Sequence, residues 1–166
     1  MKRIFLLIIL FYCQLPAANC QLASYWQQQV NYKIDITLND VDNTLDGFVK
    51  MEYYNNSPDN LYFIWMHIWP NAYKNDKTAF SEQLLINNRT DFYFSNKEQR
   101  GYINRLDFKI NGVTAQTEDH PQYTDITKII LPEALAPGAR IIITTPFHVK
   151  LPYNFCTAFW SNGFWQ

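Results

Sequence analysis

The sequence predicts an all-β protein, an antiparallel β-sandwich with one short helical and loop insertion. Its 166 residues are 48% hydrophobic and 17% aromatic, with only 17% charged residues, which is enough apolar material for one domain with a core. Aromatic side chains suit the pleated, half-buried surface of a sheet. About seven apolar runs, several of them alternating with polar residues, are separated by turn residues at the spacing expected of a sandwich.

The first residues have the features of a secretory signal peptide. Lys2 and Arg3 precede an apolar run at residues 4–12, and the small residues Ala17 and Ala18 follow. This pattern predicts a signal peptide over residues 1–20. The run is shorter than the roughly 20 apolar residues that span a bilayer. We therefore expect an exported bacterial protein, in the periplasm, at the outer membrane or outside the cell, with no integral membrane segment.

Two alternatives stay open at this end of the chain. A membrane anchor is one, and a lipid-modified Cys20 is the other, because Ala-Ala-Asn-Cys loosely resembles a bacterial lipobox. With the signal at residues 1–20, the predicted β-sandwich covers residues 21–152. Residues 153–166, rich in aromatic residues without a clear period, are predicted to be an aberrant or truncated tail.

Charge and cysteine content exclude several classes of protein. Removing Lys2 and Arg3 leaves 12 basic against 15 acidic residues, a net charge of −3, which argues against nucleic acid as a partner. Cys13 and Cys20 lie in the predicted leader, so Cys156 would be the one thiol of the mature chain. No intrachain disulfide framework is then expected.

The first half of the chain predicts a hairpin followed by a buried strand. Apolar residues occupy every second position at residues 30–38 and again at 45–53, around a turn at residues 39–43, so the two runs should pair antiparallel. Residues 61–69 are apolar on both faces apart from His67, which predicts a central strand covered on both sides. Trp65 and Trp69 are accordingly assigned to the core, while Trp26 and Trp160 stay unassigned.

Residues 71–101 interrupt the strand pattern. Thr78 is predicted to cap a short helix that places Phe80, Leu84 and Leu85 on one face. Asn88-Arg89-Thr90 fits a glycosylation sequon but is interpreted as a loop marker. The segment is therefore expected to be an insertion over the sheet.

The second half predicts further strands. Asn111-Gly112 is a strong hairpin signal, because both residues tolerate positive φ. His148 is expected at an edge strand, facing solvent. The predicted strands are residues 103–110, 113–117, 126–131 and 140–149, with a connection at 132–138.

No catalytic, cofactor-binding or metal-binding residue is predicted. A zinc peptidase needs a His-Glu-x-x-His helix, and no such motif occurs among His67, His120 and His148. Glu118-Asp119-His120 is expected in a loop with its side chains pointing apart, and a weak cation site there is the less favoured alternative. Neither Cys156 nor any serine lies in the setting of a nucleophile.

Three segments together carry a resemblance: residues 32–38, residues 45–53 and residues 63–71, the last reading Phe-Ile-Trp-Met-His-Ile-Trp-Pro-Asn. They resemble the opening strands of the aminopeptidase N-like gluzincins, the family that includes leukotriene hydrolase. Leu131-Pro132-Glu133-Ala134-Leu135-Ala136-Pro137-Gly138 is similar to the end of the same domain. The resemblance covers about residues 25–155, and residues after Phe155 depart from it.

The resemblance implies a saddle-like β domain that packs against a zinc-binding catalytic domain. Zinc and peptide substrates are expected only in that missing domain, and the chain is expected to be a truncated or frameshifted product. Its role would be structural support and one wall of the substrate cleft. The alternative is a stand-alone exported binding module that recognises glycan or protein through exposed aromatic residues and residues 71–101.

Overall fold

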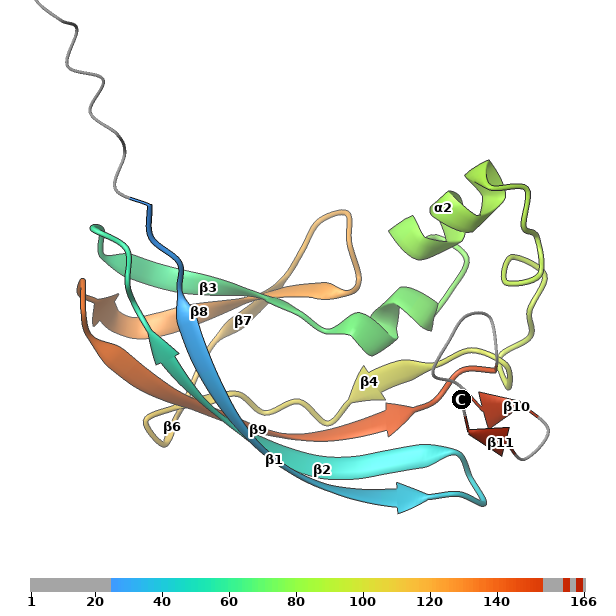
Figure 1. Ribbon diagram of the computed structural model, residues 1–166, viewed down its shortest axis with the longest axis horizontal. Helices are drawn as coiled ribbons and strands as arrows, with labels where there is room; N and C mark the ends of the chain where they lie inside the picture. The colour runs from blue at the N-terminus through green and yellow to red at the C-terminus, as the bar shows by residue number, and fades with distance from the viewer. Residues whose placement is uncertain (1–24, 154–159, 162–163, 166) are drawn as a thin grey trace, which may run out of the picture.

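The computed structural model describes residues 25–153, 160–161 and 164–165. They form an all-β fold of antiparallel strands with one short α-helix (Figure 1), as the sequence predicted. Two sheets face each other in a sandwich-like arrangement. The predicted signal peptide, most of the predicted tail, and Cys156 lie outside the described residues.

The larger sheet is built around one long strand, β9. It has the order β1-β2-β9-β5-β6, and β4 pairs with β9 beside β5. Its strands are β1 (Gln29–Asn39), β2 (Thr44–Tyr54), β4 (Tyr102–Asn104), β5 (Lys109–Ile110), β6 (Val113–Thr114) and β9 (Arg140–Lys150).

The predicted hairpin is the β1–β2 pair, which runs without a register shift over eleven residue pairs from Gln29↔Tyr54 to Asn39↔Thr44. Asn39 organises the turn, because its side-chain oxygen accepts bonds from the backbone N–H groups of Val41 and Asp42, each at 3.1 Å. Asn43 takes a left-handed φ of 55°, which asparagine tolerates well. Local turn chemistry therefore fixes the register of this hairpin.

The smaller sheet has the order β3-β8-β7 and consists of β3 (Leu61–His67), β7 (Thr117–Asp119) and β8 (Ile126–Leu135). Here the prediction for residues 61–69 was wrong. β3 pairs only with β8 among the described residues, so it is an edge strand, and one of its faces is exposed. An apolar run does not distinguish a strand with two covered faces from one with a bare aromatic face.

Three later segments also differ from the prediction. The predicted strand at residues 103–110 is divided into β4 and β5, because Arg105 takes a left-handed φ of 58° between them. Residues 113–117 do not form one strand: Ala115 still bonds to Phe108 in the larger sheet, while Gln116 bonds to Ile130 in the smaller one. The chain crosses between sheets at this point, which places Glu118 and Asp119 in β7 instead of a loop.

Strand β8 continues past the predicted end at Leu131 to Leu135. Proline is tolerated within a strand at a bulge, and the pairing of β3 with β8 shifts register between Leu61 and Phe63, opposite Pro132. The predicted Asn111-Gly112 hairpin is confirmed as the β5–β6 turn, with φ of 50° and 87°.

A single apolar core lies between the sheets. Ile129 from β8 and Ile143 from β9 have no exposed surface and belong to the same core cluster. The buried members of the core are Met51, Ile64, Phe108, Ile110, Ile129, Leu131, Leu135, Ile141 and Ile143.

The insertion is a compact unit with a small core of its own. It begins with a 3₁₀ helix, η1 (Trp69–Tyr73), and continues into α2 (Ala79–Ile86), whose cap Thr78 accepts a bond from the Ser81 N–H as predicted. Leu84 packs with the fully buried Phe92. Leu85 is exposed, contrary to the prediction, because the helix is covered on only one narrow side.

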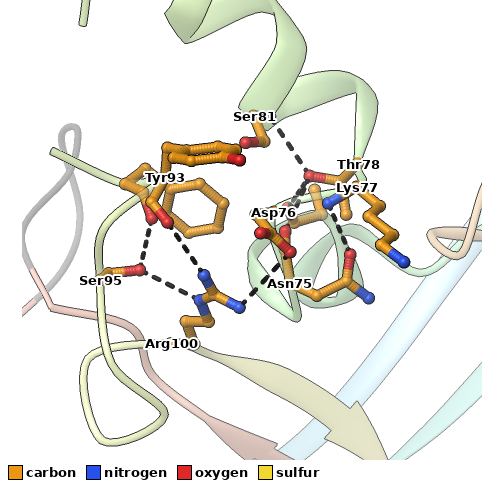
Figure 2. A network of polar contacts seen from close by, with 10 residues as sticks. Asn75, Asp76, Lys77, Thr78, Ser81, Tyr93, Ser95 and Arg100 are labelled. Atoms are coloured by element: carbon orange, nitrogen blue, oxygen red, sulfur yellow. Dashed lines mark hydrogen bonds and ion pairs between the residues drawn. The ribbon is translucent and has the colours of Figure 1, made fainter. Parts of the chain in front are cut away.

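Arg100 ties the long loop of the insertion together (Figure 2). Its guanidinium donates to the Ser95 hydroxyl at 3.1 Å and to the Tyr93 carbonyl at 3.3 Å, and lies 3.9 Å from the Asp76 carboxylate. It also sits over the ring of Phe92 at 5.6 Å. Although it has little regular structure, this segment is held by specific contacts.

Two short strands lie near the end of the chain. They are β10 (Trp160–Ser161) and β11 (Phe164–Trp165), which pair antiparallel with each other. Of the helices in the described residues, none is long and apolar enough to cross a membrane.

Candidate functional site: an open apolar groove between the sheets

The strand register places apolar side chains on one face of the larger sheet, which we call the inner face. Tyr32 lies opposite Met51, which in turn lies opposite Ile143, and Ile34 lies opposite Val49 in the same way. Directly opposed residues of antiparallel strands point to the same side. The inner face is therefore apolar from β1 across to β9.

The smaller sheet covers only part of this face. Met51 is 4% exposed and Ile143 is fully buried, whereas Tyr32, Ile34 and Ile36 on β1 are 63%, 54% and 61% exposed. In Figure 1 the smaller sheet lies above the end where β1 begins, while the β1–β2 turn extends away at the opposite end. From Tyr32 to Leu38 the inner face of β1 is thus exposed, whereas Val30 at its start packs against the core.

An open groove of about 500 Å³ lies where the two sheets separate. The inner face of β1, β2 and β9 forms one side, and the end of β3 with the start of η1 forms the other. We call it the intersheet groove, and its lining includes Tyr32, Ile34, Val49, Met51, Ile64, Met66, Ile68, Pro70, Ile103, Leu106, Phe147 and Val149.

The lining of the groove has no Asp, Glu, Lys or Arg side chain. Thr145 is one of its few polar residues, and its hydroxyl already accepts a bond from the Asp107 N–H at 2.8 Å and donates to the Pro146 carbonyl at 2.9 Å. Burial raises the pKa of Tyr53, which also lines the groove, because low polarity disfavours the phenolate. Trp65, His67 and Trp69 line it as well, so the groove offers mainly apolar and aromatic contact, with the His67 imidazole as a titratable group.

His67 and His120 belong to the smaller sheet and its connection, whereas His148 lies on the larger sheet. His67 is exposed and its ring stacks on Trp69 at 4.8 Å, while His120 Nδ1 accepts bonds from the backbone N–H groups of Gln122 and Tyr123. In the described part of the chain, no three His, Cys, Asp or Glu side chains come together in a group that could hold a metal ion.

His148 was predicted on a solvent-facing edge, and this was wrong. It lies on β9, which is flanked on both sides, and its Nδ1 is 2.8 Å from Asp46 Oδ1. Arg105 donates to the same carboxylate oxygen at 3.0 Å. This cluster joins β2, β9 and the segment after β4 on the outer face of the larger sheet.

The two tryptophans assigned to the core are exposed. Trp65 is 46% exposed because the outer face of β3 is uncovered, and Trp69, the first residue of η1, is 66% exposed. Trp65 lies 6.1 Å from Phe63 and 5.3 Å from His120, ring centroid to centroid. Residues 63, 65 and 67 are spaced by two, and every second residue of a strand points to the same face, so the sequence already indicated that these side chains share one face.

These side chains form a surface feature that we call the aromatic row. Lys128 from β8 extends over it, with Nζ 4.7 Å from the Phe63 ring centroid, and forms an ion pair with Glu118 at 3.0 Å. The members of the row are Phe63, Trp65, His67, Trp69, His120 and Tyr123.

The chain matches no protein-family model, and no curated protein is similar to it.

The candidate sequon at Asn88 falls on an exposed turn with a φ of 58°, so its interpretation as a loop marker agrees with the structure.

Proposed function

We propose that this chain is a non-catalytic β domain of an exported aminopeptidase N-like zinc metallopeptidase, and that the intersheet groove is the surface on which the catalytic domain packs. The observation that carries the proposal is the uncovered inner face of β1, with Ile34 54% and Ile36 61% exposed. Zinc and the peptide substrate would be held by the catalytic domain. This chain would support that domain and form one wall of its cleft.

The composition of the groove favours a permanent domain partner. Its lining continues from the buried Met51 and Ile143 to the exposed Tyr32, so an apolar element placed there would extend the existing core. Interfaces that never open resemble a domain core cut in half, whereas transient ones are more polar. Exposed apolar patches of this kind mark interaction sites.

The resemblance of residues 32–38, 45–53 and 63–71 to the opening strands of that family supplies the identity of the partner. The deciding experiment is to sequence the gene downstream of residue 166 for a His-Glu-x-x-His motif in any frame, and to express the joined protein. We expect zinc-dependent hydrolysis of an aminoacyl anilide by the joined protein and none by this chain. Hydrolysis by this chain, or the absence of any such motif downstream, would contradict the proposal.

Variants on opposite faces of β1 distinguish the loss of groove contacts from a general destabilisation of the fold. Tyr32→Ser and Ile34→Ser, both in the groove lining on β1, should loosen domain packing in the joined protein, measured as faster cleavage of the domain junction by added protease. Thr37→Ser on the outer face of the same strand is the matched control. Equal protection in all three would exclude the groove as the packing surface.

A second candidate function rests on the aromatic row. Exposed Trp and Tyr rings stack on sugar rings or on a partner protein. Trp65 and Trp69 are both exposed, and Trp69 begins the 3₁₀ helix that leads into the insertion. A stand-alone binding module should show a change in Trp fluorescence with an oligosaccharide panel, lost in Trp65→Ala and kept in Trp26→Ala. No response to any sugar would remove the glycan form of this candidate.

A further inference from the structure

Strand β1 is an unprotected sheet edge. It spans eleven residues, pairs with β2 alone among the described strands, and is exposed at ten of its eleven positions. Natural proteins blunt such edges with proline, bulges or charges that point inward. The pairing of β1 with β2 has no bulge, the strand contains no proline, and its inward positions are apolar. This edge is able to accept another strand.

The charges on β1 have no partner of opposite sign in the described structure. Lys33 and Asp35 lie on the outer face, and neither makes an ion pair. Across the hairpin Lys33 lies directly opposite Lys50, and Asp35 lies opposite Phe48. Like charges directly opposite each other disfavour pairing. An acidic residue on the free side of Lys33 would offset this repulsion.

We propose that β1 pairs antiparallel with β1 of a second copy of this chain, about a two-fold axis through Ile34. In this register each Lys33 lies opposite the Asp35 of the other copy, twice by symmetry. Ile34 lies opposite its own counterpart, and the apolar inner stripe continues across the axis. The remaining inner pairs are Tyr32 with Ile36 and Val30 with Leu38, and the remaining outer pairs are Asn31 with Thr37 and Gln29 with Asn39.

The sequence of β1 selects this register over its neighbours. A slip of one residue would turn the apolar face of one copy away from that of the other. The adjacent symmetric registers, which keep the apolar faces together, place Lys33 opposite Lys33 in one case and Asp35 opposite Asp35 in the other. The axis through Ile34 thus satisfies both the apolar and the charged positions. Such an interface is isologous and closes as a dimer.

The proposal uses the edge of β1, whereas the proposed function uses the inner face. Self-association can therefore be measured whether or not a catalytic domain packs in the groove. The probe is the full chain itself, in sedimentation equilibrium up to hundreds of micromolar. We expect a monomer–dimer equilibrium, and a wild-type chain that stays monomeric over this range would overturn the proposal.

Charge reversal tests the register. Lys33→Asp places acid opposite acid at both symmetric positions, and Asp35→Lys places base opposite base, so each variant should self-associate at least roughly tenfold more weakly. Glu133→Lys makes the same charge change as Asp35→Lys at an exposed position on β8, and should leave association unchanged. Circular dichroism checks that each variant is folded.

Mixing the two variants gives the sharpest outcome. A Lys33→Asp chain offers two acids and an Asp35→Lys chain offers two bases, so the mixture should form a heterodimer although each variant alone self-associates only weakly. The double variant with both substitutions should regain self-association. If the mixture stays monomeric, or if both single variants dimerise as well as the wild type, pairing through this register is excluded.

Discussion

Asn55 is the residue whose replacement should most clearly reveal how the two sheets are joined. It is fully buried in the connection between β2 and β3. Its side-chain amide donates to the Leu135 carbonyl at 2.9 Å and to the Asp59 carbonyl at 2.8 Å, while its side-chain oxygen accepts from the Ser57 hydroxyl at 2.6 Å. Its backbone bonds to Gly138 and Ala139. One side chain thus connects β2, β3 and β8.

Asn55→Ala removes both donors and leaves the buried Leu135 carbonyl without this partner. A lost hydrogen bond costs roughly 0.5–1.5 kcal/mol, and a buried group left unsatisfied costs about 1–3 kcal/mol. Some water can reach the partly buried Asp59 carbonyl, so we expect a total loss near 3 kcal/mol. For a chain of this size, that lowers the melting temperature by roughly 10 °C.

The neighbouring Asn56 provides a matched control. It is exposed, and its side chain donates to the Gln27 carbonyl at 3.0 Å in contact with solvent. Asn56→Ala should change the free energy of unfolding by less than about 0.5 kcal/mol. Urea unfolding followed by circular dichroism measures both variants. If Asn55→Ala lies within 0.5 kcal/mol of Asn56→Ala, the proposed role of the buried amide is refuted.

Three further predictions concern the core and the groove. Ile143→Ala should lower the free energy of unfolding by about 2–5 kcal/mol in urea, whereas Trp65→Ala, at an exposed position, should cost about 1 kcal/mol or less; equal costs would contradict the assignment of faces. Gly47→Ala should cost about 1–3 kcal/mol in the same assay, because a Cβ there collides with the ring of Phe147, and an unchanged midpoint would contradict this contact. The pKa of Tyr53 is raised in the folded state, so the unfolded state loses this proton first and stability falls as pH rises above about 10. The Tyr53→Phe variant should lose less stability than the wild type between about pH 10 and 11. Identical pH profiles for the two proteins would contradict the raised pKa.

The failed assignment of Trp65 shows which information a strand pattern lacks. The run at residues 61–69 predicted a strand, because aromatic and β-branched residues favour that backbone, and the structure has one that ends at His67, before η1. Whether its faces are buried depends on what packs against them, and the outer face of β3 is exposed in the described structure. The same limit applies to His148, whose strand was predicted but whose flanking strands and Asp46 partner come from distant parts of the chain.

The sequence predicted only part of the candidate site. Alternation at residues 30–38 predicted an apolar face on β1, yet nothing local shows that the smaller sheet stops before covering it. The aromatic row depends on β3, β7 and the segment after it meeting in space. These segments are far apart in the sequence, so only the complete fold brings their side chains together.

What the sequence determined by itself was therefore local: the β1–β2 hairpin, the Thr78 cap and the Asn111-Gly112 turn, since turn residues and side-chain periodicity act within a few positions. Tertiary structure alone decided which apolar faces are buried. Ile143 is buried and Ile34 is exposed, although both point to the inner face of the larger sheet, because burial depends on the element that packs against a strand and not on the strand itself.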